Sequence, residues 1–329
     1  MSTFAIIGAG LSGMACAHVL QDAGHSVTLF DKARGPGGRM ASRRRQWPLA
    51  DGLTPPFTFD IGAQFLTARD DAFRAQCAQW AEQGVMAQWD DPDHQAHETR
   101  WVGIPRMSAI TRQMAEGLEI VDDCRISALH REAEGWRLTS DDPEAPQTLG
   151  SQVFDQVVFA TPSPQSIPLL SAHSSTLTQA LQQVEMLPCW TVYIAFDQLL
   201  PLDREWDQPE HDDVIQWWAG EHHKPGRGEP PRLIIQATAQ WSQTHLEEDP
   251  ETIQTQLVEH WQALTGQALP AIGLIGAHRW RYAKPQQALG VDWLNDGSLS
   301  VCGDACLGGR VESAWCSGHR LGQHLSTQE

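Results

Sequence analysis

The chain has 329 residues, of which 41% are hydrophobic and 19% charged, so it is long enough for about two globular domains. Its formal net charge is -18, with 41 acidic against 23 basic side chains. A field of this sign repels nucleic-acid backbones and anionic lipid, and it therefore argues against both as partners.

The cysteines and the apolar stretches indicate a cytoplasmic protein. The seven cysteines are an odd number, and none has the spacing of a Cys-x-x-Cys or Cys/His metal motif. Reduced thiols are typical of the cytoplasm. The apolar stretch Phe4 to Leu20 lacks the preceding basic residues of a signal peptide, and no stretch reaches the length of a membrane span. We therefore expect a cytoplasmic location, no membrane segment and no bound metal.

The first 31 residues predict a complete β-α-β unit. Residues 3–7 form an apolar run typical of a buried parallel strand. Residues 14–23 have the apolar spacing of a helix, and residues 26–30 form a second strand. Between the first strand and the helix lies a G-x-G-x-x-G loop, Gly8 to Gly13.

Three glycines and one acid give this unit its chemistry. Gly8 allows the tight turn out of the strand, Gly10 lets the backbone approach a pyrophosphate, and Gly13 lets the helix pack closely on the strands. The helix N-terminus offers free N–H groups to the anion. Asp31 ends the second strand, where a carboxylate accepts hydrogen bonds from a ribose hydroxyl. A glycine loop often serves only as a turn, but the flanking strands, helix and acid favour a dinucleotide site.

A second glycine-rich loop follows directly, with Gly37, Gly38 and Arg39 at its centre. An NAD-dependent dehydrogenase has no obvious use for a second glycine loop at this place. A flexible loop is the alternative, but the position behind the β-α-β unit favours a role in binding. The cluster of residues 43–45, three arginines, is a candidate receiver of an anionic dinucleotide, and a solvated loop is an equally good interpretation.

The middle of the chain predicts further strands and a second domain. Asp60 to Thr67 contains Gly62 and Ala63, small residues that let a backbone come close to a bound ring. Apolar strands are expected at residues 125–129 and 153–160. Between residues 165 and 276 we expect strands at 191–196 and 232–238 and an amphipathic helix at 251–264. Most tryptophans of this region are expected to pack in a core.

The last part of the chain combines a strand with a glycine-rich turn. Residues 298–304 form a strand that ends in Gly303 and Asp304, and the turn Gly308 to Val311 opens a helix. Such a helix N-terminus stabilises negative charge on a nearby group. His278 lies upstream in the segment A-H-R-W-R-Y-A, and a hydrogen-bonded structural histidine is the better interpretation of it than a catalytic base.

Together these segments resemble the FAD-containing amine oxidase superfamily over nearly the whole chain. The G-x-G-x-x-G, G-G-R and Gly-Asp elements are typical of the superfamily as a whole. The segments D-I-G-A-Q-F-L-T-A-R-D, W-V-G-I-P, A-H-R-W-R-Y-A and G-R-V-E-S-A-W are similar to those of the bacterial renalases. One departure is Arg106, which stands where that branch usually has glycine before the methionine, and it puts the local backbone conformation in doubt.

The resemblance implies a fold and a division into domains. The expected class is α/β (α+β), with an FAD-binding Rossmann-like domain of the p-hydroxybenzoate hydroxylase/amine oxidase type and an inserted mixed-sheet substrate domain. Residues 1–68, 106–163 and 276–329 would form the FAD-binding domain. Residues 69–105 and 164–275 would form the substrate domain.

The resemblance also implies FAD as a cofactor and the residues that hold it. FAD would be bound noncovalently, because no cysteine lies between Cys189 and Cys302, where the covalent linkage of monoamine oxidases would be expected. The expected cofactor contacts are Gly8, Gly10, Leu11, Ser12, Gly13, Asp31, Lys32, Gly37, Gly38, Arg39, Met40, Ala63, Gln64, Phe65, Ile126, Gly303, Asp304, Arg310, Val311 and Glu312. The expected lining of the active site is Phe65, Thr67, His278, Trp280 and Tyr282, with no catalytic side chain assigned.

The implied activity is the oxidation of 2- or 6-dihydro-NAD(P) to NAD(P)+, with hydride passing to FAD and dioxygen reduced to hydrogen peroxide. The dihydropyridine nitrogen expels the hydride, so positioning of the ring supplies much of the catalysis and no strong base is needed. The partners would be this small molecule and dioxygen, and the oligomeric state stays open.

Three alternatives are left open. An amine oxidase commonly has two aromatic rings, often tyrosines, facing the amine, and this chain has only Tyr193 and Tyr282, although tryptophan can substitute. A flavin-binding protein without turnover would differ by failing to reoxidise. A plain NAD dehydrogenase comes last, because it would purify without a yellow chromophore.

Overall fold

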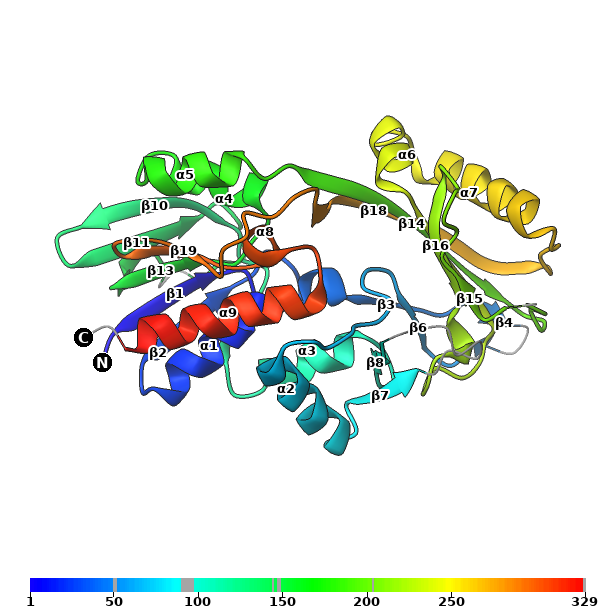
Figure 1. Cartoon of the computed structure of the whole chain (residues 1–329), viewed down its shortest axis with the longest axis horizontal. Coiled ribbons are helices and arrows are strands. Elements are labelled where there is room, and N and C mark those ends of the chain that lie inside the picture. The colour runs from blue at the N-terminus through cyan, green and yellow to red at the C-terminus, as the bar shows by residue number, and fades with distance from the viewer. Residues whose placement is uncertain (50–51, 90–97, 144, 147–148, 203, 328–329) are drawn as a thin grey trace.

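The computed structural model describes residues 1–49, 52–89, 98–143, 145–146, 149–202 and 204–327. Two large sheets lie in the two halves of the molecule, one near both termini and the other at the far end beside α6 and α7 (Figure 1). In the part of the chain described, no helix combines the length and the apolar character that crossing a membrane requires.

The sheet near the termini has six strands in the order β19-β20-β13-β1-β2-β9. The strands are β1 (Thr3–Ile7), β2 (Ser26–Phe30), β9 (Glu119–Val121), β13 (Gln156–Phe159), β19 (Leu294–Asp296) and β20 (Leu299–Val301). All pairs are parallel except the edge pair β19–β20. Helix α1 (Leu11–Asp22) connects β1 to β2 and confirms the predicted β-α-β unit. Parallel strands bring their carboxyl ends to one edge, where ligands of such sheets bind.

The prediction of a single strand at residues 153–160 is wrong, because this segment forms two strands. It divides into β12 (Val153–Phe154), which pairs with β11, and β13, which pairs with β1. The residue between them, Asp155, accepts hydrogen bonds from the backbone N–H and the hydroxyl of Thr3 at 2.7 and 2.9 Å. Together with the bond from the Asp155 N–H to the Thr3 carbonyl at 3.0 Å, these side-chain bonds hold the chain to β1 at the point where it changes sheets.

A three-stranded antiparallel sheet covers one side of the six-stranded sheet. It contains β10 (Ile126–Glu132), β11 (Gly135–Ser140) and β12. Helices α4 (Ser163–Leu170) and α5 (Ser175–Gln182) pack beside it, and their leucines share one apolar cluster with Trp136 and Phe154.

The far sheet has five strands in the order β15-β16-β17-β14-β18. They are β14 (Met186–Phe196), β15 (Trp206–Asp207), β16 (Ile215–Gly220), β17 (Arg232–Ala237) and β18 (Ile272–Pro285). Every pair is antiparallel, so the mixed sheet predicted for this domain is not found here; mixed pairing occurs in the six-stranded sheet. Strand β18 runs through residue 276, where the sequence placed a domain border.

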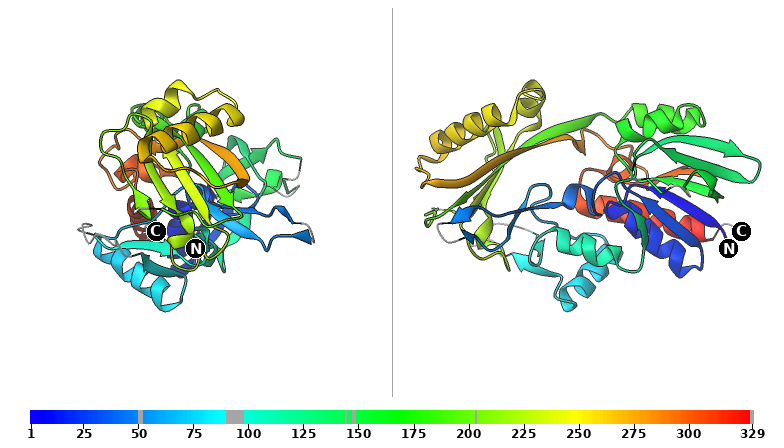
Figure 2. Two further views of the ribbon diagram at one scale, coloured as in Figure 1. Left: turned by 90° about the vertical axis from the view of Figure 1, so that its right-hand side faces the viewer. Right: turned by 180° about the vertical axis from the view of Figure 1, so that it is seen from behind.

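Side chains of the five-stranded sheet alternate between two apolar clusters. Helices α6 (Ala239–Thr244) and α7 (Pro250–Thr265) lie on one face, where Trp190, Trp218 and Trp261 are buried as expected (Figure 2). The opposite face packs on β3 (Ser42–Arg45) and β6 (Phe57–Asp60) through a second cluster. That second cluster contains Trp47, Phe57, Phe59, Tyr193, Trp280 and their neighbours.

The remaining strands form two antiparallel pairs, β4 (Pro48–Leu49) with β5 (Gly52–Leu53) and β7 (Met86–Trp89) with β8 (Arg100–Gly103). The remaining α-helices are α2 (Asp71–Glu82), α3 (Ser108–Ala115), α8 (Asp304–Leu307) and α9 (Val311–Ser326).

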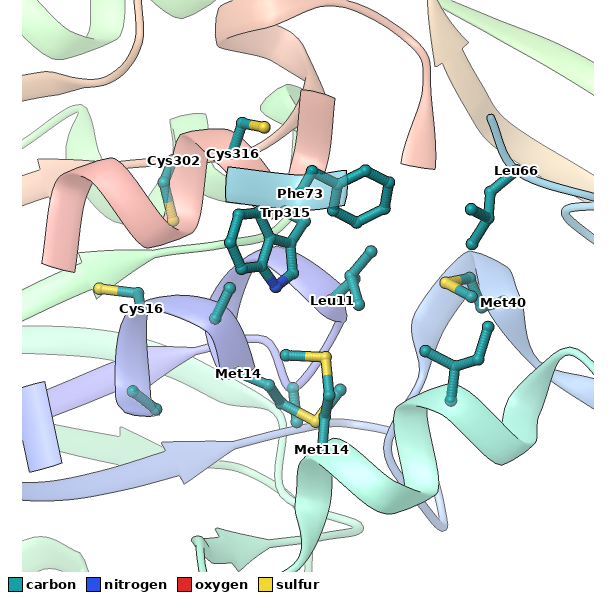
Figure 3. Close-up of a cluster of buried hydrophobic side chains, with 14 of the residues drawn as sticks. Leu11, Met14, Cys16, Met40, Leu66, Phe73, Met114, Cys302, Trp315 and Cys316 are labelled. Carbon is teal, nitrogen blue, oxygen red and sulfur yellow. The ribbon is translucent and has the colours of Figure 1, made fainter. Parts of the chain in front are cut away.

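Helices α1 and α9 cross in close contact at Ser12, near the end of the glycine loop. A Cβ at Gly318 would overlap the carbonyl of Ser12, so only glycine permits this distance between the two backbones. Beside the crossing, Leu11 and Met14 lie near Trp315, whose ring is 5.4 Å from that of Phe73 (Figure 3). The last helix of the chain is thereby fixed against the first loop.

Candidate functional site

The first glycine loop has the geometry of an anion cradle. Gly8 has φ +109°, and a Cβ there would lie 2.9 Å from the carbonyl oxygen of Ala160, while a Cβ on Gly13 would overlap the carbonyl of Gly8. Gly10 is different, because a Cβ there would meet no atom within 4 Å. Close packing thus explains two of the glycines, and the open space in front of Gly10 is what a bound pyrophosphate requires.

Asp31 holds this loop from the next strand. Its two carboxylate oxygens accept the N–H groups of Ala9 at 2.8 Å and Ala33 at 2.9 Å. Burial raises the pKa of Asp31 above its usual value, and the two N–H bonds oppose that rise. Burial lowers the pKa of the neighbouring Lys32, because it disfavours the charged ammonium, and the positive charge of Arg125 lowers it further. Ser12, at the helix start, donates to Cys302 Sγ at 3.0 Å.

The second glycine loop meets the carboxy-terminal signature through an ion pair. The guanidinium of Arg39 donates to both carboxylate oxygens of Asp304, at 2.5 and 2.8 Å, and to the carbonyl of Ala283 at 3.1 Å. The side chain of Asp304 is 8% exposed and that of Arg39 is 31% exposed. Gly37 donates its N–H to the carbonyl of Ala9, so both glycine loops and the last signature lie together.

The segment Asp60 to Phe65 lies between these loops and the five-stranded sheet. Ala63 donates its N–H to the carbonyl of Arg39 at 3.0 Å. From the sheet, Trp280 Nε1 donates to the carbonyl of Ile61 and Gln236 to that of Gly62, both at 2.8 Å. A Cβ on Gly62 would overlap the Arg39 carbonyl, so the close approach predicted at this glycine is made to protein backbone.

A buried ionic cluster anchors the start of this segment. Asp60 Oδ2 accepts Arg227 Nη2 at 2.5 Å, and Lys224 Nζ lies 3.2 Å from Glu221 and 3.9 Å from Asp60. Lys224 also donates to Gln64 Oε1 at 3.0 Å. The Asp60, Glu221, Lys224 and Arg227 side chains are at most 1% exposed. The cluster therefore joins the segment to the connection between β16 and β17.

Charge balance within this cluster decides the protonation of its acids. Burial alone would raise the pKa of Asp60, but Arg227 and Lys224 hold it below its usual value. Burial raises the pKa of Glu221, and the Asp60 charge adds to that rise. Burial lowers the pKa of Lys224 against the opposing effect of the two acids.

A cavity of about 660 Å³ opens beside Ala63 and the start of α9. Its lining is Ala63, Phe65, Leu66, Thr67, Arg69, Glu98, Arg100, Gly309, Arg310 and Val311. The Phe65 ring lies 5.2 Å from Trp217, and the guanidinium of Arg100 lies 3.6 Å above Trp206. One wall of the cavity is therefore aromatic and carries a cation.

The cavity charges are arranged in pairs. Glu98 forms an ion pair with Arg69, whose Nη2 lies 2.8 Å from it. Arg310 donates to the hydroxyl of Thr67 and to the carboxylate of Glu312, each at 2.8 Å. Glu312 also accepts the N–H groups of Arg69 and Asp70, so it organises the loop before α2.

The predicted lining residues lie in three places. Phe65 and Thr67 line the cavity, while His278 and Trp280 lie on β18 beyond Gly62, with ring centroids 4.4 Å apart. Tyr282, two residues beyond Trp280 on β18, packs against the apolar cluster of the six-stranded sheet. Thus the structure brings together only part of the set.

The predicted cofactor residues also differ in their surroundings. Those of the two glycine loops and the Gly303–Asp304 turn surround the Gly10 space, and Arg310 and Val311 line the cavity. Met40 is buried in the core, and Ile126 is buried in β10. The carboxamide of Gln64 bonds Lys224 and the carbonyls of Asp60 and Gly62, so its polar atoms are engaged by protein.

Several site residues were not predicted from the sequence. Arg69 lies within the predicted segment that ends in T-A-R-D, and Arg100 immediately precedes W-V-G, so a search for charges in and beside those motifs could have found both. Trp217 and Lys224 carry no local signal, because their places depend on β16 reaching across to Phe65 and Gln64.

The unusual Arg106 needs no glycine-like backbone. Among the described residues other than glycine, Asp123 is the one with a positive φ. Arg106 therefore has a conformation open to any residue, and its Nε donates to Ser108 Oγ at 3.2 Å. In the same described part of the chain, no group of three His, Cys, Asp or Glu side chains is placed to hold a metal ion.

His278 is expected to make stability depend on pH. Burial, and secondarily Arg43, lowers the pKa of His278 to about 4. In the unfolded chain the same imidazole binds a proton near pH 6.5, so below that pH the unfolded state binds more protons than the folded state. The free energy of unfolding is therefore highest above pH 6.5 and should fall by roughly 2–3 kcal/mol as the pH drops toward 4. Unfolding of His278→Gln in phosphate-free buffers should show a shallower loss over this range than unfolding of the parent protein. Equal pH profiles would contradict this assignment.

Comparison with known families decides the identity of the fold. Residues 6–80 match the family described as "NAD(P)-binding Rossmann-like domain". Residues 90–324 match the family described as "Flavin containing amine oxidoreductase". The chain belongs to the flavin containing amine oxidoreductase family. It is accordingly a flavin-dependent oxidoreductase with FAD as its cofactor, and the cradle in front of Gly10 fits that group.

Individual relatives of this oxidoreductase agree on the fold. A protein from Exiguobacterium sp. 255-15, described as a protoporphyrinogen oxidase, has a TM-score of 0.76 at 14% identity, covering 100% of this chain and 99% of that one. Cyclohexylamine oxidase from Brevibacterium oxydans IH-35A has a TM-score of 0.71 at 12% identity, covering 99% and 98%. Identities this low establish the fold alone.

A curated relative matches only at the amino terminus. The 4,4'-diapophytoene desaturase (4,4'-diaponeurosporene-forming) of Staphylococcus aureus strain Newman is 39% identical over 74 residues. That match spans 22% of this chain and 13% of the desaturase, so it concerns the dinucleotide-binding unit.

Gly10→Ala separates cofactor binding from folding. Gly10 has φ -79°, which alanine adopts freely, and open space around it, so we expect the FAD-free protein to unfold within about 0.5 kcal/mol of the parent. The added methyl occupies the pyrophosphate space and should weaken FAD binding about ten- to hundredfold, measured by quenching of flavin fluorescence. Gly13→Ala is the contrast, because its methyl overlaps the Gly8 carbonyl and should destabilise the FAD-free protein itself. Unchanged FAD affinity in Gly10→Ala would contradict the cradle.

Proposed function

We propose that this oxidoreductase oxidises 2- or 6-dihydro-NAD(P) to NAD(P)+, with dioxygen as the final electron acceptor and hydrogen peroxide as the product. The observation that carries the proposal is the charge of the cavity beside Ala63. Among the side chains that line it, the charged groups are the guanidinium groups of Arg69, Arg100 and Arg310 and the carboxylate of Glu98. Arg69 is paired with Glu98, and Arg310 is paired with Glu312 behind the lining. In a chain of net charge -18, such a lining favours an anionic substrate.

The carboxylate is poorly placed for an alkylammonium substrate. Glu98 is paired with Arg69, so binding an amine there would require breaking an Arg–carboxylate pair. A dihydronicotinamide dinucleotide makes no such demand, because its ring is neutral and its phosphates are negative. Phe65, which packs against Trp217, offers apolar surface to a flat ring.

The described residues of the cavity supply positioning more than proton transfer. Its titratable groups are guanidinium groups and a paired carboxylate, and none resembles a general base poised near neutral pH. FAD, when bound, accepts the hydride and returns the electrons to dioxygen. The protein's contribution is then to hold the dihydropyridine ring at the mouth of the cavity and to exclude water from it.

An amine oxidase is the second candidate function. Phe65 lines the cavity, and Trp217 packs against it with the ring planes inclined at 47°, so the cavity has an aromatic wall of the kind that faces a neutral amine. The cyclohexylamine oxidase with this fold is a second reason to keep it.

The test is anaerobic mixing of the purified yellow protein with each substrate class. We expect 2- and 6-dihydro-NAD(P) isomers to bleach the flavin absorbance rapidly, and air to restore it with release of peroxide. Cyclohexylamine and diamines serve as the parallel arm. Bleaching by an amine alone would replace the first function by the second, and no bleaching by either class would contradict both.

We also propose the domain division expected from the sequence and a cytoplasmic location. The strands of the six-stranded sheet come from residues 3–30, 119–159 and 294–301, and those of the five-stranded sheet from residues 186–285, which supports an inserted substrate domain.

All seven cysteines are buried and free, which supports a reducing compartment. Limited proteolysis and thiol titration of the native protein would test these two proposals.

A further inference from the structure

Strand β3 presents its three arginines to two different sides. In its antiparallel pairing with β6, Arg43 stands opposite Phe59 and Arg45 opposite Phe57. Opposite residues of an antiparallel pair share a face, so Arg43 and Arg45 lie on the side that packs against the five-stranded sheet. Arg44 lies on the other side and is exposed.

The two inward arginines contact groups that carry no negative charge. Arg43 Nη2 lies 3.3 Å from Nδ1 of His278, and Arg45 Nη2 donates to the Tyr193 hydroxyl at 3.0 Å. His278 is neutral at pH 7, because burial lowers its pKa to about 4. With Nδ1 accepting from Arg43, the ring proton of His278 is on Nε2.

Neither inward arginine has a counter-ion in the part of the chain described. Arg43 and Arg45 form no ion pair with a carboxylate there, and both are half-buried. This differs from Arg39, which binds Asp304, and from Arg279, which binds Glu247. In a chain with 41 acidic side chains, two adjacent half-buried cations without a carboxylate are an arrangement suited to an external anion.

The pair lies at the border of the functional site. The His278 ring is 4.4 Å from the Trp280 ring, and Trp280 donates to the carbonyl of Ile61, two residues before Ala63 of the cavity. On the other side, β3 begins three residues after Arg39. A ligand that extends from the cavity past Gly62 would run toward the strand that carries these arginines.

We propose that Arg43 and Arg45 form a binding site for a phosphate group, with the Nε2–H of His278 as a further donor. Residues two apart on a strand are separated by about 6.8 Å, a distance that the oxygens of one phosphate or pyrophosphate bridge between two guanidinium groups. Arginine's planar fork suits phosphate better than a lysine does. The identification of the source as the pyrophosphate of the dinucleotide substrate rests on the proposed function; free phosphate or pyrophosphate has the same chemistry.

Calorimetric titration of the FAD-loaded protein with inorganic pyrophosphate tests the site directly. We expect the parent protein to bind it and both Arg43→Gln and Arg45→Gln to bind it at least about tenfold more weakly, as the loss of a charged hydrogen bond predicts. Arg44→Gln is the matched control, since it removes the same charge from the same strand and should bind within about twofold of the parent. An unchanged flavin spectrum verifies that each variant is folded. No binding by the parent, or equal losses in all three variants, would overturn the site.

Steady-state kinetics distinguishes the two sources. If the site holds the substrate, pyrophosphate competes with dihydro-NAD(P), and Arg43→Gln and Arg45→Gln raise KM with little change in kcat. If it holds a free anion, pyrophosphate does not compete. A protein that binds pyrophosphate through Arg43 and Arg45 but fails to oxidise dihydro-NAD(P) would refute the proposed function and leave the site standing. Turnover without any arginine-dependent pyrophosphate binding would refute the site alone.

Discussion

Replacing Asp304 by alanine should produce a protein that purifies without bound FAD. The substitution leaves the guanidinium of Arg39, 31% exposed, without the bidentate partner that joins the second glycine loop to the carboxy-terminal turn. Removing one partner of a fully buried ion pair costs about 3–5 kcal/mol, and the loss of stability here should be smaller because water reaches the remaining guanidinium. Because the loops that surround the Gly10 space lose their connection, we expect FAD affinity to fall about hundredfold or more, measured by flavin fluorescence.

Glu247→Ala is the matched control for this prediction. Glu247 also pairs with arginines, Arg279 and Arg281, but its side chain is 68% exposed and lies far along the chain from the glycine loops. Exposed ion pairs contribute little to stability, because water and salt screen the two charges. This variant should therefore keep its yellow colour and nearly its full stability. If Asp304→Ala retained FAD as well as Glu247→Ala does, the ion pair with Arg39 would not hold the site.

Lys224→Met should be the most destabilising of the single substitutions considered. The change keeps most of the side-chain volume but leaves the carboxylates of Glu221 and Asp60 buried with one cation fewer. An uncompensated buried charge costs about 3–5 kcal/mol, measurable in denaturant unfolding of the FAD-free protein. Gln64 also loses its ammonium donor, so the segment beside the cavity should become less ordered.

Two further variants sharpen this test. Lys284→Met removes an exposed lysine and should change the free energy of unfolding by no more than about 0.5 kcal/mol. Glu221→Gln combined with Lys224→Met removes both charges, and it should recover at least about 1 kcal/mol relative to the sum of the single changes. Additive losses, or a Lys224→Met protein as stable as the parent, would show that the cluster is not a coupled ionic unit.

The three arginines of β3 could not be assigned a role from the sequence pattern alone. A run of like charges has no preferred interpretation by itself, and both an anion site and a solvated loop were consistent with residues 43–45. The pairing of β3 with β6 separates the run into two inward side chains and one outward one. Which of them meets His278 or Tyr193 depends on strands more than 140 residues away in the chain.

Local patterns were sufficient for the dinucleotide-binding unit. The turn at Gly8, the open approach at Gly10, the close packing at Gly13 and the acid at Asp31 all lie within 31 residues. Each requirement is steric or hydrogen-bonding between near neighbours, so it leaves a mark on the order of residue types. The fold class and the FAD cofactor followed from this unit together with the two later signatures.

Only the tertiary structure decided how those signatures act on one another. The sequence by itself predicted Arg39 and Asp304 as separate cofactor contacts, but their ion pair spans 265 positions. The same is true of Lys224, which bonds Gln64 across 160 positions, and of Trp217, which packs against Phe65 of the cavity wall. Contacts between distant segments depend on how sheets and helices pack, and one residue's type places few constraints on its distant partner. The cofactor's binding loops were therefore legible in the sequence, while the cavity, its charges and the buried ionic cluster were determined by packing.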